Sequence, residues 1–387
     1  MFRFQAPADH RRIRDTLAGA GYDDKGVSEL LGVNLSQLVG RKLAPLLRRT
    51  AGGSRLETLV RLFVLGVRVD GDHAKTALGP DVGWWVDGGL LAPHGDEVEA
   101  TVQLRCYQTL VVAFDFHRRG GAPLRPDYVM GISASSLTLA GLTVRPASRS
   151  TLDLGTGNGF QAFLAAQHSE RVVATDRNPR AVAMAQFNVD LNELGTIECR
   201  EGDLFDPVAG ETFDLIVSNP PFIVSPDNAF YFLHSGLAAD EVCRTIARQA
   251  PKHLSEGGYC QFLANWAPAG GKDWRTWLAG WFEGTGCDAL VLRRGSTPVD
   301  EYAATWIESE EDEGFERSFD DWMAYYARLG IEAVDSGLVT LRRPVAGAGA
   351  GAGTPWFRAE DSPETMTFPA GGDLLARFAA EDFLAAR

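Results

Sequence analysis

Short apolar runs alternate with longer amphipathic stretches along the chain from about residue 150 onward. The runs are rich in β-branched residues, and the stretches between them place apolar residues at helical spacing, so this section predicts strands alternating with helices. Such alternation is typical of a parallel sheet covered on both faces. We expect strands at 150–155, 171–176, 197–203, 213–219, 257–265, 287–294 and 337–343. We expect helices near 159–167, 178–193, 237–253 and 272–283.

The first 120 residues have a different pattern. Residues 10–20 and 27–32 predict short helices, and SRLETLVRLFVLG (54–66) places apolar residues at helical spacing. A "GGLL" turn followed by alternating residues then predicts a β-hairpin. Together these elements resemble a small winged-helix-like accessory domain. For Trp84 and Trp85, packing in a small core is favoured over a recognition surface.

The chain is expected to contain four parts. An accessory domain with a role in substrate recognition spans 1–120, and the sheet domain spans 121–344. The Gly/Ala segment at 345–355 is too poor in large side chains to pack and predicts a linker, followed by a tail at 356–387 with a terminal amphipathic helix. An insertion at 299–329, rich in acidic and aromatic residues, separates the last two strands. It is either a lid that faces a basic substrate or a solvated helical excursion.

The composition is that of a globular protein, because 387 residues with 45% apolar content are enough for about two domains. No apolar run approaches the roughly 20 residues that span a bilayer, and the N-terminus has no apolar signal segment. We therefore expect a soluble, cytoplasmic chain with no membrane partner. The five cysteines are scattered without the spacing of metal ligands, so we expect no metal site.

Charge is distributed unevenly along the chain. Residues 1–150 contain 19 Lys and Arg against 15 Asp and Glu, whereas residues 151–387 contain 18 against 36. This asymmetry indicates either an anionic partner for the front half or a basic partner for the rest. A solvated acidic surface that aids solubility explains it equally well.

The first strand of the expected sheet runs into Asp153-Leu-Gly155-Thr156-Gly157-Asn-Gly159. Glycines there let the backbone turn tightly and approach a ligand, and the next helix begins with free N–H groups. The spacing is GxGxG and not the GxGxxG of dinucleotide sites, with an acidic residue two positions before the first glycine. A carboxylate in this position suits a ligand with an ammonium group, such as the amino-acid end of S-adenosylmethionine (SAM).

Two further aspartates follow the next two expected strands. Asp176 ends the second strand and can accept both hydroxyls of a ribose in the crevice at the strand ends. Asp203 follows the third strand and can accept from the adenine amino group, while Leu204 packs against the ring. A lone aspartate is more often a helix cap or a turn former. Three acidic groups at the ends of consecutive strands favour a binding site.

The fourth expected strand ends at Asn219-Pro220-Pro221-Phe222. The prolines lack N–H groups and fix φ, so the Asn219 oxygen and the Pro220 carbonyl are two rigid acceptors spaced to grip both hydrogens of one NH₂ group. Phe222 supplies a flat face for a planar substrate. A delocalised amide or exocyclic nitrogen is a poor nucleophile, and this grip aims its lone pair at a methyl donor by orientation and electrostatics.

These motifs together resemble a known family. LDLGTGNG, VVATD, GDLF and SNPPF, in this order, are similar to the class I SAM-dependent N-methyltransferases of the "methyltransferase small" group, over roughly residues 125–343. The group includes rRNA guanine-N2 and adenine-N6 methyltransferases and the glutamine methyltransferases of release factors. The resemblance implies a Rossmann-like seven-stranded sheet whose last strand is antiparallel, and SAM as cofactor.

The resemblance also implies roles for matching residues. The residues implied to contact SAM are Asp153, Gly155, Thr156, Gly157, Gly159, Asp176, Arg177, Asp203, Leu204 and Asn219. Asn219 and Pro220 are implied to grip the substrate NH₂, with Pro221 as part of the same catalytic motif and Phe222 for stacking. Release-factor methyltransferases usually have NPPY and a PRPETE-like segment, whereas this chain has NPPF and PDYVMGISASS (126–136). The target of methylation therefore stays open.

The loop after NPPF and one tryptophan carry smaller signals. Tyr231 and His234 can contact substrate, although water is favoured over His234 as the acceptor of the released proton. For Trp266 a place in the core is favoured over a place in the pocket wall.

We expect an enzyme that transfers a methyl group from SAM to a planar NH₂ nitrogen of a macromolecule. A base of ribosomal RNA is slightly favoured, because Phe222 can stack a flipped base and the front domain is basic. The alternative is a glutamine side chain of a translation protein, such as a release factor, which the acidic second part of the chain favours. A small-molecule amine and a SAM-binding module without turnover are further alternatives. The sequence does not indicate an oligomeric state.

Overall fold

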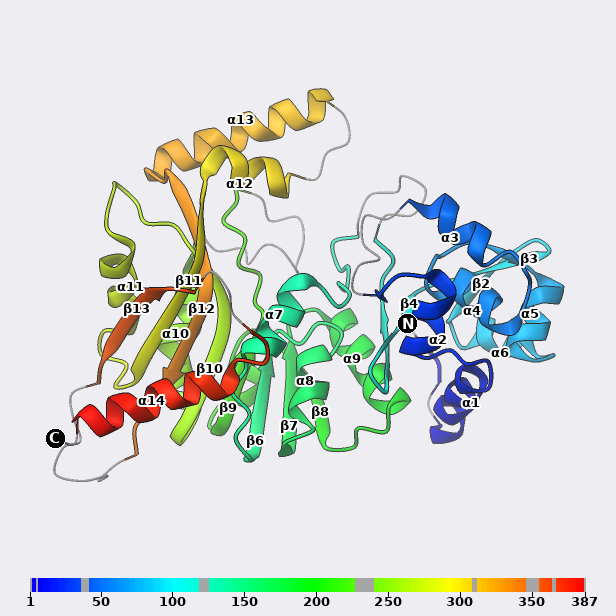
Figure 1. Ribbon diagram of the computed structural model, residues 1–387, viewed down its shortest axis with the longest axis horizontal. Coiled ribbons are helices and arrows are strands. Elements are labelled where there is room, and N and C mark those ends of the chain that lie inside the picture. Colours follow the sequence, from blue (N-terminus) through cyan, green and yellow to red (C-terminus); the bar gives the residue numbers. More distant parts are fainter. Residues whose placement is uncertain are drawn as a thin grey trace. The chain divides into compact units, whose positions relative to one another are not determined.

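The computed structural model describes residues 2–4, 6–35, 42–117, 125–226, 240–307, 312–345, 355–363 and 367–385. Here the chain forms two compact units (Figure 1). Unit 1 comprises Met1–Ala134, Gly157–Phe160 and Pro179–Gly195. Unit 2 comprises Ser135–Thr156, Gln161–Asn178 and Thr196–Arg387.

Unit 1 is mainly helical. Its helices are α1 (Pro7–Ala18), α2 (Asp24–Leu31), α3 (Leu43–Arg49), α4 (Arg55–Phe63), α5 (Gly71–Leu78), α6 (Val82–Asp87) and α9 (Pro179–Leu191). Its strands are β1 (Val69–Asp70), β2 (Leu91–His94), β3 (Glu97–Ala100), β4 (Gln103–Tyr107) and β5 (Leu110–Phe114). The hairpin expected after GGLL is confirmed, because β2 and β3 pair antiparallel and β3 also pairs with β1. Local sequence explains the start of α4, where Ser54 and Glu57 form a capping box.

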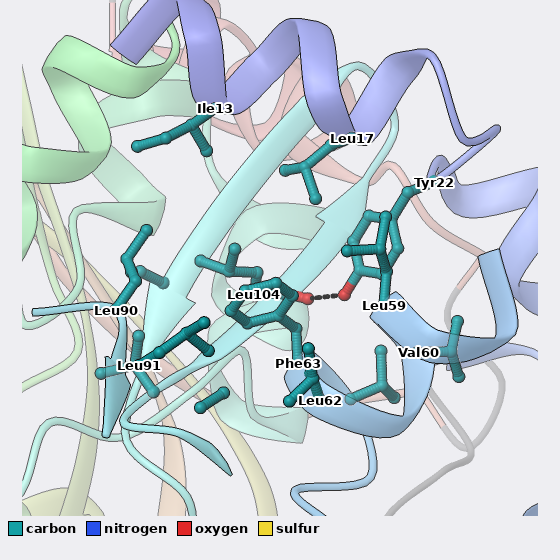
Figure 2. Packing of buried hydrophobic residues seen from close by; sticks show 14 of the residues in the cluster. Ile13, Leu17, Tyr22, Leu59, Val60, Leu62, Phe63, Leu90, Leu91 and Leu104 are labelled. Carbon is teal, nitrogen blue, oxygen red and sulfur yellow. Dashed lines mark hydrogen bonds between the residues drawn. The ribbon is translucent and has the colours of Figure 1, made fainter. Parts of the chain in front are cut away.

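A large apolar cluster lies in the described part of unit 1. Leu17, Leu59 and Phe63 are at most 1% exposed in it (Figure 2). The Tyr22 hydroxyl crosses the same core and donates a hydrogen bond to the Leu104 carbonyl (Figure 2). Burial of these side chains is the main stabilising contribution to such a small helical unit. Trp84 and Trp85 belong to this core, as expected: Trp85 is fully buried and Trp84 packs against it edge to face.

Helix α9 joins unit 1 through polar as well as apolar contacts. The Asn188 side chain accepts from the Ala113 N–H (2.7 Å) and donates to the Ala113 carbonyl (2.9 Å). One turn later, Asn192 makes the same pair of bonds to Val111. The two amides therefore supply partners for backbone groups of β5, as a neighbouring strand would do. The sequence assigned this helix to the sheet domain, whereas its contacts place it in unit 1.

Unit 2 is built on one sheet. Its strands are β6 (Ser148–Leu154), β7 (Ser169–Asp176), β8 (Ile197–Glu201), β9 (Phe213–Ser218), β10 (Leu254–Trp266), β11 (Asp288–Pro298), β12 (Ala333–Arg342) and β13 (Phe357–Asp361). Its helices are α7 (Ala134–Leu142), α8 (Phe160–Ala165), α10 (Glu241–Gln249), α11 (Trp274–Phe282), α12 (Val299–Trp306), α13 (Asp312–Leu329) and α14 (Gly371–Ala385), with short 3₁₀ turns η2 (Asp206–Val208) and η3 (Ala250–His253). Among the described residues, no helix is both long and apolar enough to cross a membrane.

The strand order is β13-β11-β12-β10-β9-β6-β7-β8. The seven expected strands are all present, and β12 is antiparallel to both its neighbours, β10 and β11. The α/β Rossmann-like sheet with an antiparallel strand near the end is therefore confirmed. Helices α8, α9, α10 and α11 occupy the four expected positions.

Alternate residues of the strands face opposite sides of the sheet. Leu215 and Val217 of β9 face α7 and α14, in a group of buried residues that we call the α14-side cluster. Ile216 faces α10 and α11, in what we call the α11-side cluster. Because both sides are covered, the strands are apolar on both faces, as a buried sheet requires.

The C-terminal tail is an integral part of unit 2. Residues 357–361 form β13, an eighth strand that pairs parallel to β11 and that the sequence analysis did not expect. Helix α14 (Figure 1) buries Leu374 and Phe378 in the α14-side cluster, where the Phe378 ring contacts Tyr259 of β10 and Trp356. Arg342 of β12 pairs with Asp382 of α14 and with Asp288 of β11. The expected terminal helix is thus present, and it is docked. Most of the linker, 346–354, lies outside the described residues.

We expect Phe378→Ala to lower the free energy of unfolding by about 3 to 5 kcal/mol, because Phe378 is 0% exposed and its removal leaves a cavity under α14. Phe383→Ala on the same helix is the control, because Phe383 is 58% exposed. Urea unfolding of both variants measures the difference. Equal losses for the two would show that α14 is not docked as described.

Candidate active site

The carboxyl ends of four neighbouring strands lie side by side at one edge of the sheet. Leu154, the last residue of β6, is paired with Thr175 of β7 and with Ser218 of β9. Asp176, the last residue of β7, is paired with Glu201 of β8. This register brings the segments that follow these strands to the same edge, which is where open α/β sheets bind ligands.

The glycine loop after β6 has a backbone that only glycine adopts without strain. Gly155, Gly157 and Gly159 have φ values of 74°, 58° and 94°. The Thr175 carbonyl accepts from the N–H groups of Gly155 (2.9 Å) and Thr156 (2.8 Å), which fixes the turn to β7. A Cβ atom on Gly155 or Gly157 would meet no atom of the described residues within 4 Å. The loop therefore borders open space, where a ligand can approach the backbone.

Asp153 is buried under this loop, with 1% exposure. Its Oδ2 accepts from the Thr156 hydroxyl (2.5 Å) and from the Ala162 N–H in α8 (2.9 Å), so it ties the loop to the helix. Burial, with a smaller contribution from the nearby charge of Asp176, raises the pKa of Asp153 to about 7 despite these two hydrogen bonds. The environment thus penalises a lone negative charge and favours a cation beside it.

The ends of β7 and β8 carry the other predicted cofactor residues. Asp176 is half-buried, and its Oδ1 accepts from the Asn178 N–H (2.8 Å) in a local turn, with half-buried Arg177 between them. Asp203 is exposed just after β8, and Leu204 packs against the α11-side cluster with a φ of 43°. Asp176 is therefore a turn former as well as a candidate ligand. The structure brings all these residues to the edge where the glycine loop begins.

Asn219 follows β9 at the same edge, and its side chain is held by one end only. The Ser218 hydroxyl donates to the Leu154 carbonyl (2.7 Å), which locks β9 to β6 just before the motif. The Asn219 Nδ2 donates to the Ser135 hydroxyl in α7 (3.1 Å). The Asn219 Oδ1 is buried and has no hydrogen-bond partner within the described part of the chain. An unsatisfied buried acceptor costs about 1 to 3 kcal/mol, so the site presents an oxygen that a ligand N–H can satisfy.

The other three residues of the NPPF motif are buried or half-buried. Pro220 is buried, and Pro221 and Phe222 are half-buried. Phe222 touches the α14-side cluster, the α11-side cluster and a third cluster, formed by Ile223, Val224 and residues of α12 and α13, that we call the insertion cluster. Its ring therefore sits at the junction of three apolar groups while part of it stays accessible.

The structure adds one residue that the sequence analysis missed and tests one further assignment. Ser135 lies in the ISASS segment, where nothing in the pattern singles it out, and only the fold places it against Asn219. Trp266 is 0% exposed in the α11-side cluster, which confirms the core assignment. Tyr231 and His234 lie outside the described residues.

The groups at this edge fit a SAM molecule. They combine an open glycine loop, a buried carboxyl that favours a neighbouring cation, a half-buried aspartate and an amide oxygen that has no partner among the described residues. SAM carries an ammonium group, two ribose hydroxyls and a sulfonium, which these groups can match. No group of three His, Cys, Asp or Glu side chains in the described ranges is placed to hold a metal ion.

Comparison with known proteins gives two family matches. The sequence model described as "Methyltransferase small domain" matches residues 133–270, which include the glycine loop and NPPF. A second model, described as a domain of unknown function (DUF7059), matches residues 19–101, within the N-terminal helices and hairpin.

Glutamine methyltransferases from several bacteria are similar to the part of the chain that contains the first match. A release factor glutamine methyltransferase of Xylella fastidiosa is 31% identical over 46% of this chain and 75% of its own length. The release factor glutamine methyltransferase of Escherichia coli is 36% identical over 30% of this chain and 46% of its own length. A ribosomal protein uL3 glutamine methyltransferase of Bradyrhizobium diazoefficiens is 35% identical over 28% of this chain and 38% of its own length.

The raised pKa of Asp153 predicts a pH-dependent stability. A carboxyl with a pKa of 3.8 in the unfolded chain and about 7 in the fold destabilises the fold increasingly as pH rises through that window. Asp153→Asn lacks this penalty while its amide oxygen can still accept from Thr156 and Ala162. The variant's stability relative to wild type should therefore rise between pH 4 and 7, by up to about 4 kcal/mol, and level off above pH 7. Urea unfolding at each pH measures it, and a constant difference contradicts the assignment.

Proposed function

This chain belongs to the methyltransferase small family of SAM-dependent methyltransferases, and from that membership we propose that it methylates the side-chain amide nitrogen of a glutamine in a translation protein. The curated relatives named above act on glutamine in release factors or in ribosomal protein uL3. The rRNA base favoured by the sequence analysis has less support, because none of these named relatives acts on RNA.

The observation that carries the proposal is the orientation of Asn219. Its nitrogen donates to Ser135, so its buried oxygen faces away from that bond and lacks a partner in the described chain. The adjoining carbonyl belongs to Pro220, whose ring fixes the backbone. Two acceptors on a rigid segment can take both hydrogens of a carboxamide NH₂, which a glutamine side chain has.

A carboxamide nitrogen is a weak nucleophile, so the protein must orient it for methyl transfer. SAM supplies a methyl group on a sulfonium, and transfer forms a carbon–nitrogen bond, breaks the carbon–sulfur bond with its electron pair left on sulfur, and releases one amide proton to water. Asn219 and Pro220 hold the amide so that its lone pair points at the carbon, and Phe222 packs against its flat face. Preorganised acceptors of this kind act in the transition state at little reorganisation cost.

The proposed cofactor residues lie at four strand ends, those of β6, β7, β8 and, for Asn219, β9. Asp153 and the glycine loop provide the site for the amino-acid end, Asp176 the site for the ribose, and Asp203 with Leu204 the site for adenine. The full proposed set is Asp153, Gly155, Thr156, Gly157, Gly159, Asp176, Arg177, Asp203, Leu204 and Asn219. A cation at Asp153 offsets the cost of ionising that buried carboxyl.

Charge also favours a protein substrate. Residues 151–387 contain 36 Asp and Glu against 18 Lys and Arg, so the part of the sequence that holds the family motifs is strongly acidic. An acidic surface repels RNA phosphates and attracts basic proteins. The basic excess in residues 1–150 is small by comparison, with 19 Lys and Arg against 15 Asp and Glu.

We expect the purified chain to transfer label from radioactive SAM to a release factor or ribosomal protein, with the label sensitive to protease, resistant to RNase and located on glutamine by mass spectrometry. Asn219→Ala should lower kcat by at least about 100-fold, because the variant loses one of the two acceptors. Its Kd for SAM, from isothermal calorimetry, should change much less than kcat, because Asn219 is one of ten residues proposed to contact SAM. RNase-sensitive label would support an RNA base instead and contradict the glutamine proposal.

Ser135→Ala tests the orientation of Asn219 separately. Loss of the hydroxyl frees the amide to rotate, so kcat/KM should fall about tenfold, which corresponds to roughly 1.4 kcal/mol of lost positioning. Ser135→Thr retains a hydroxyl and should recover most of the rate.

Thr138→Val is the matched control for Ser135→Ala. It removes a hydroxyl on the same helix that accepts from Arg294 (3.2 Å). Its kcat/KM should remain near the wild-type value. Equal losses in Ser135→Ala and Thr138→Val would indicate a general effect on α7 and not a specific one on Asn219.

A further inference from the structure

The insertion between β11 and β12 packs against the segment that follows NPPF. It forms α12 and α13 (Figure 1), and Tyr302, Trp322 and Tyr326 from these helices are buried together with Ile223 and Val224 in the insertion cluster. The acidic residues of the two helices that the structure describes are exposed. The insertion is a helical excursion with an exposed acidic face, as one expectation had it, but its aromatic face is part of the core. The alternative of a lid that faces a basic substrate stays a prediction.

Two tyrosine hydroxyls from the insertion hold the backbone of one residue. The Val224 N–H donates to the Tyr302 hydroxyl (3.3 Å), and the Val224 carbonyl accepts from the Tyr326 hydroxyl (2.7 Å). Asn265 Nδ2 also donates to the Tyr302 hydroxyl (2.7 Å). Val224 is thus held on both its backbone groups by side chains that lie about 80 and 100 positions later in the sequence.

The segment needs such partners because it has no regular structure. Residues 219–226 belong to neither a helix nor a strand, yet Val224 is 0% exposed. Pro220, Pro221 and Pro226 have no N–H to donate. A buried backbone group without a partner is costly, so without the two tyrosines the segment would move toward solvent.

The surroundings keep both hydroxyls protonated. Tyr302 is 5% exposed and Tyr326 is 1% exposed. Burial raises the pKa of each phenol well above the ordinary value of 10. At neutral pH each group is therefore an uncharged phenol, as the bond from Tyr326 to the Val224 carbonyl requires.

We propose that Tyr302 and Tyr326 are positioning residues, which fix Val224 and thereby hold Phe222 and the Asn219-Pro220 acceptors where the substrate amide must lie. The inference rests on the proposed function of the NPPF motif. Phe222 is two residues from Val224 and packs in the same insertion cluster, so displacement of one moves the other. A shift of about 1 Å at a reacting group is enough to lower turnover strongly.

The test uses Tyr302→Phe, Tyr326→Phe and the double variant in the full-length chain. Each removes a hydroxyl and keeps the ring in the core. For the double variant we expect kcat/KM toward the protein substrate to fall about tenfold, with intermediate losses in the single variants. We expect the Kd for SAM to change less than about twofold, because the glycine loop is untouched. Hydrogen exchange in the peptide that covers 219–226 should accelerate at least about tenfold.

Tyr22→Phe is the matched control. It removes a buried hydroxyl that donates to the Leu104 carbonyl in the core of unit 1 (Figure 2). It should lower thermal stability in the same way, with kcat/KM per folded molecule and exchange at 219–226 unchanged.

Three outcomes overturn the inference: unchanged exchange at 219–226 in the double variant, accelerated exchange with a normal kcat/KM, or an equal loss of kcat/KM in Tyr22→Phe. If the wild-type chain methylates no glutamine-bearing protein, the proposed function fails. The exchange measurement still decides whether the tyrosines hold the segment.

Discussion

The chemistry proposed for this protein depends on a hydrogen bond that fixes one end of an amide and leaves the other end without a partner in the described chain. Asn219 donates from Nδ2 to Ser135, and its Oδ1 is buried with no partner in the described chain. In this orientation Nδ2 is the donor to Ser135, so Oδ1 is the amide atom left for a ligand N–H. Neighbouring contacts, such as the Ser218 bond to Leu154, hold the strand end in place and so offset the free-energy cost of the buried oxygen. A ligand N–H that satisfies the oxygen recovers that cost on binding.

Hydrogen bonds from neighbouring elements hold α7, the helix that carries Ser135, in place. The Gln161 side chain donates to the Ser136 carbonyl (2.8 Å), so the first turn of α7, which carries Ser135, is tied to α8. At its other end α7 is covered by α14, and the Ala370 N–H donates to the Gly141 carbonyl (2.8 Å). The C-terminal tail thus packs on the helix that carries Ser135, whose proposed role is to orient Asn219.

Electrostatics and strand register act together at the same edge. Asp153 and Asp176 are close enough for one charge to raise the pKa of the other, because β6 and β7 end in register. Two neighbouring carboxyls in a partly buried site favour a cationic ligand over an anionic one. This preference agrees with SAM, whose ammonium and sulfonium are positive, and disagrees with a dinucleotide pyrophosphate. The GxGxG spacing and the negative electrostatic potential of the two carboxyls therefore both favour SAM.

The sequence alone determined the local features, and the tertiary structure decided which of them meet. Period-2 and helical patterns, glycines that need positive φ, and prolines without an N–H are properties of short segments, so the seven strands and the candidate residues of the motifs were predictable. Strand β13 has no strong apolar pattern, and only pairing with the β11 edge makes it a strand. Ser135, Tyr302 and Tyr326 have side chains that suit almost any surface or core position. Their roles arise from contacts with residues about 80 to 100 positions away, which depend on how the chain packs and which no local pattern encodes.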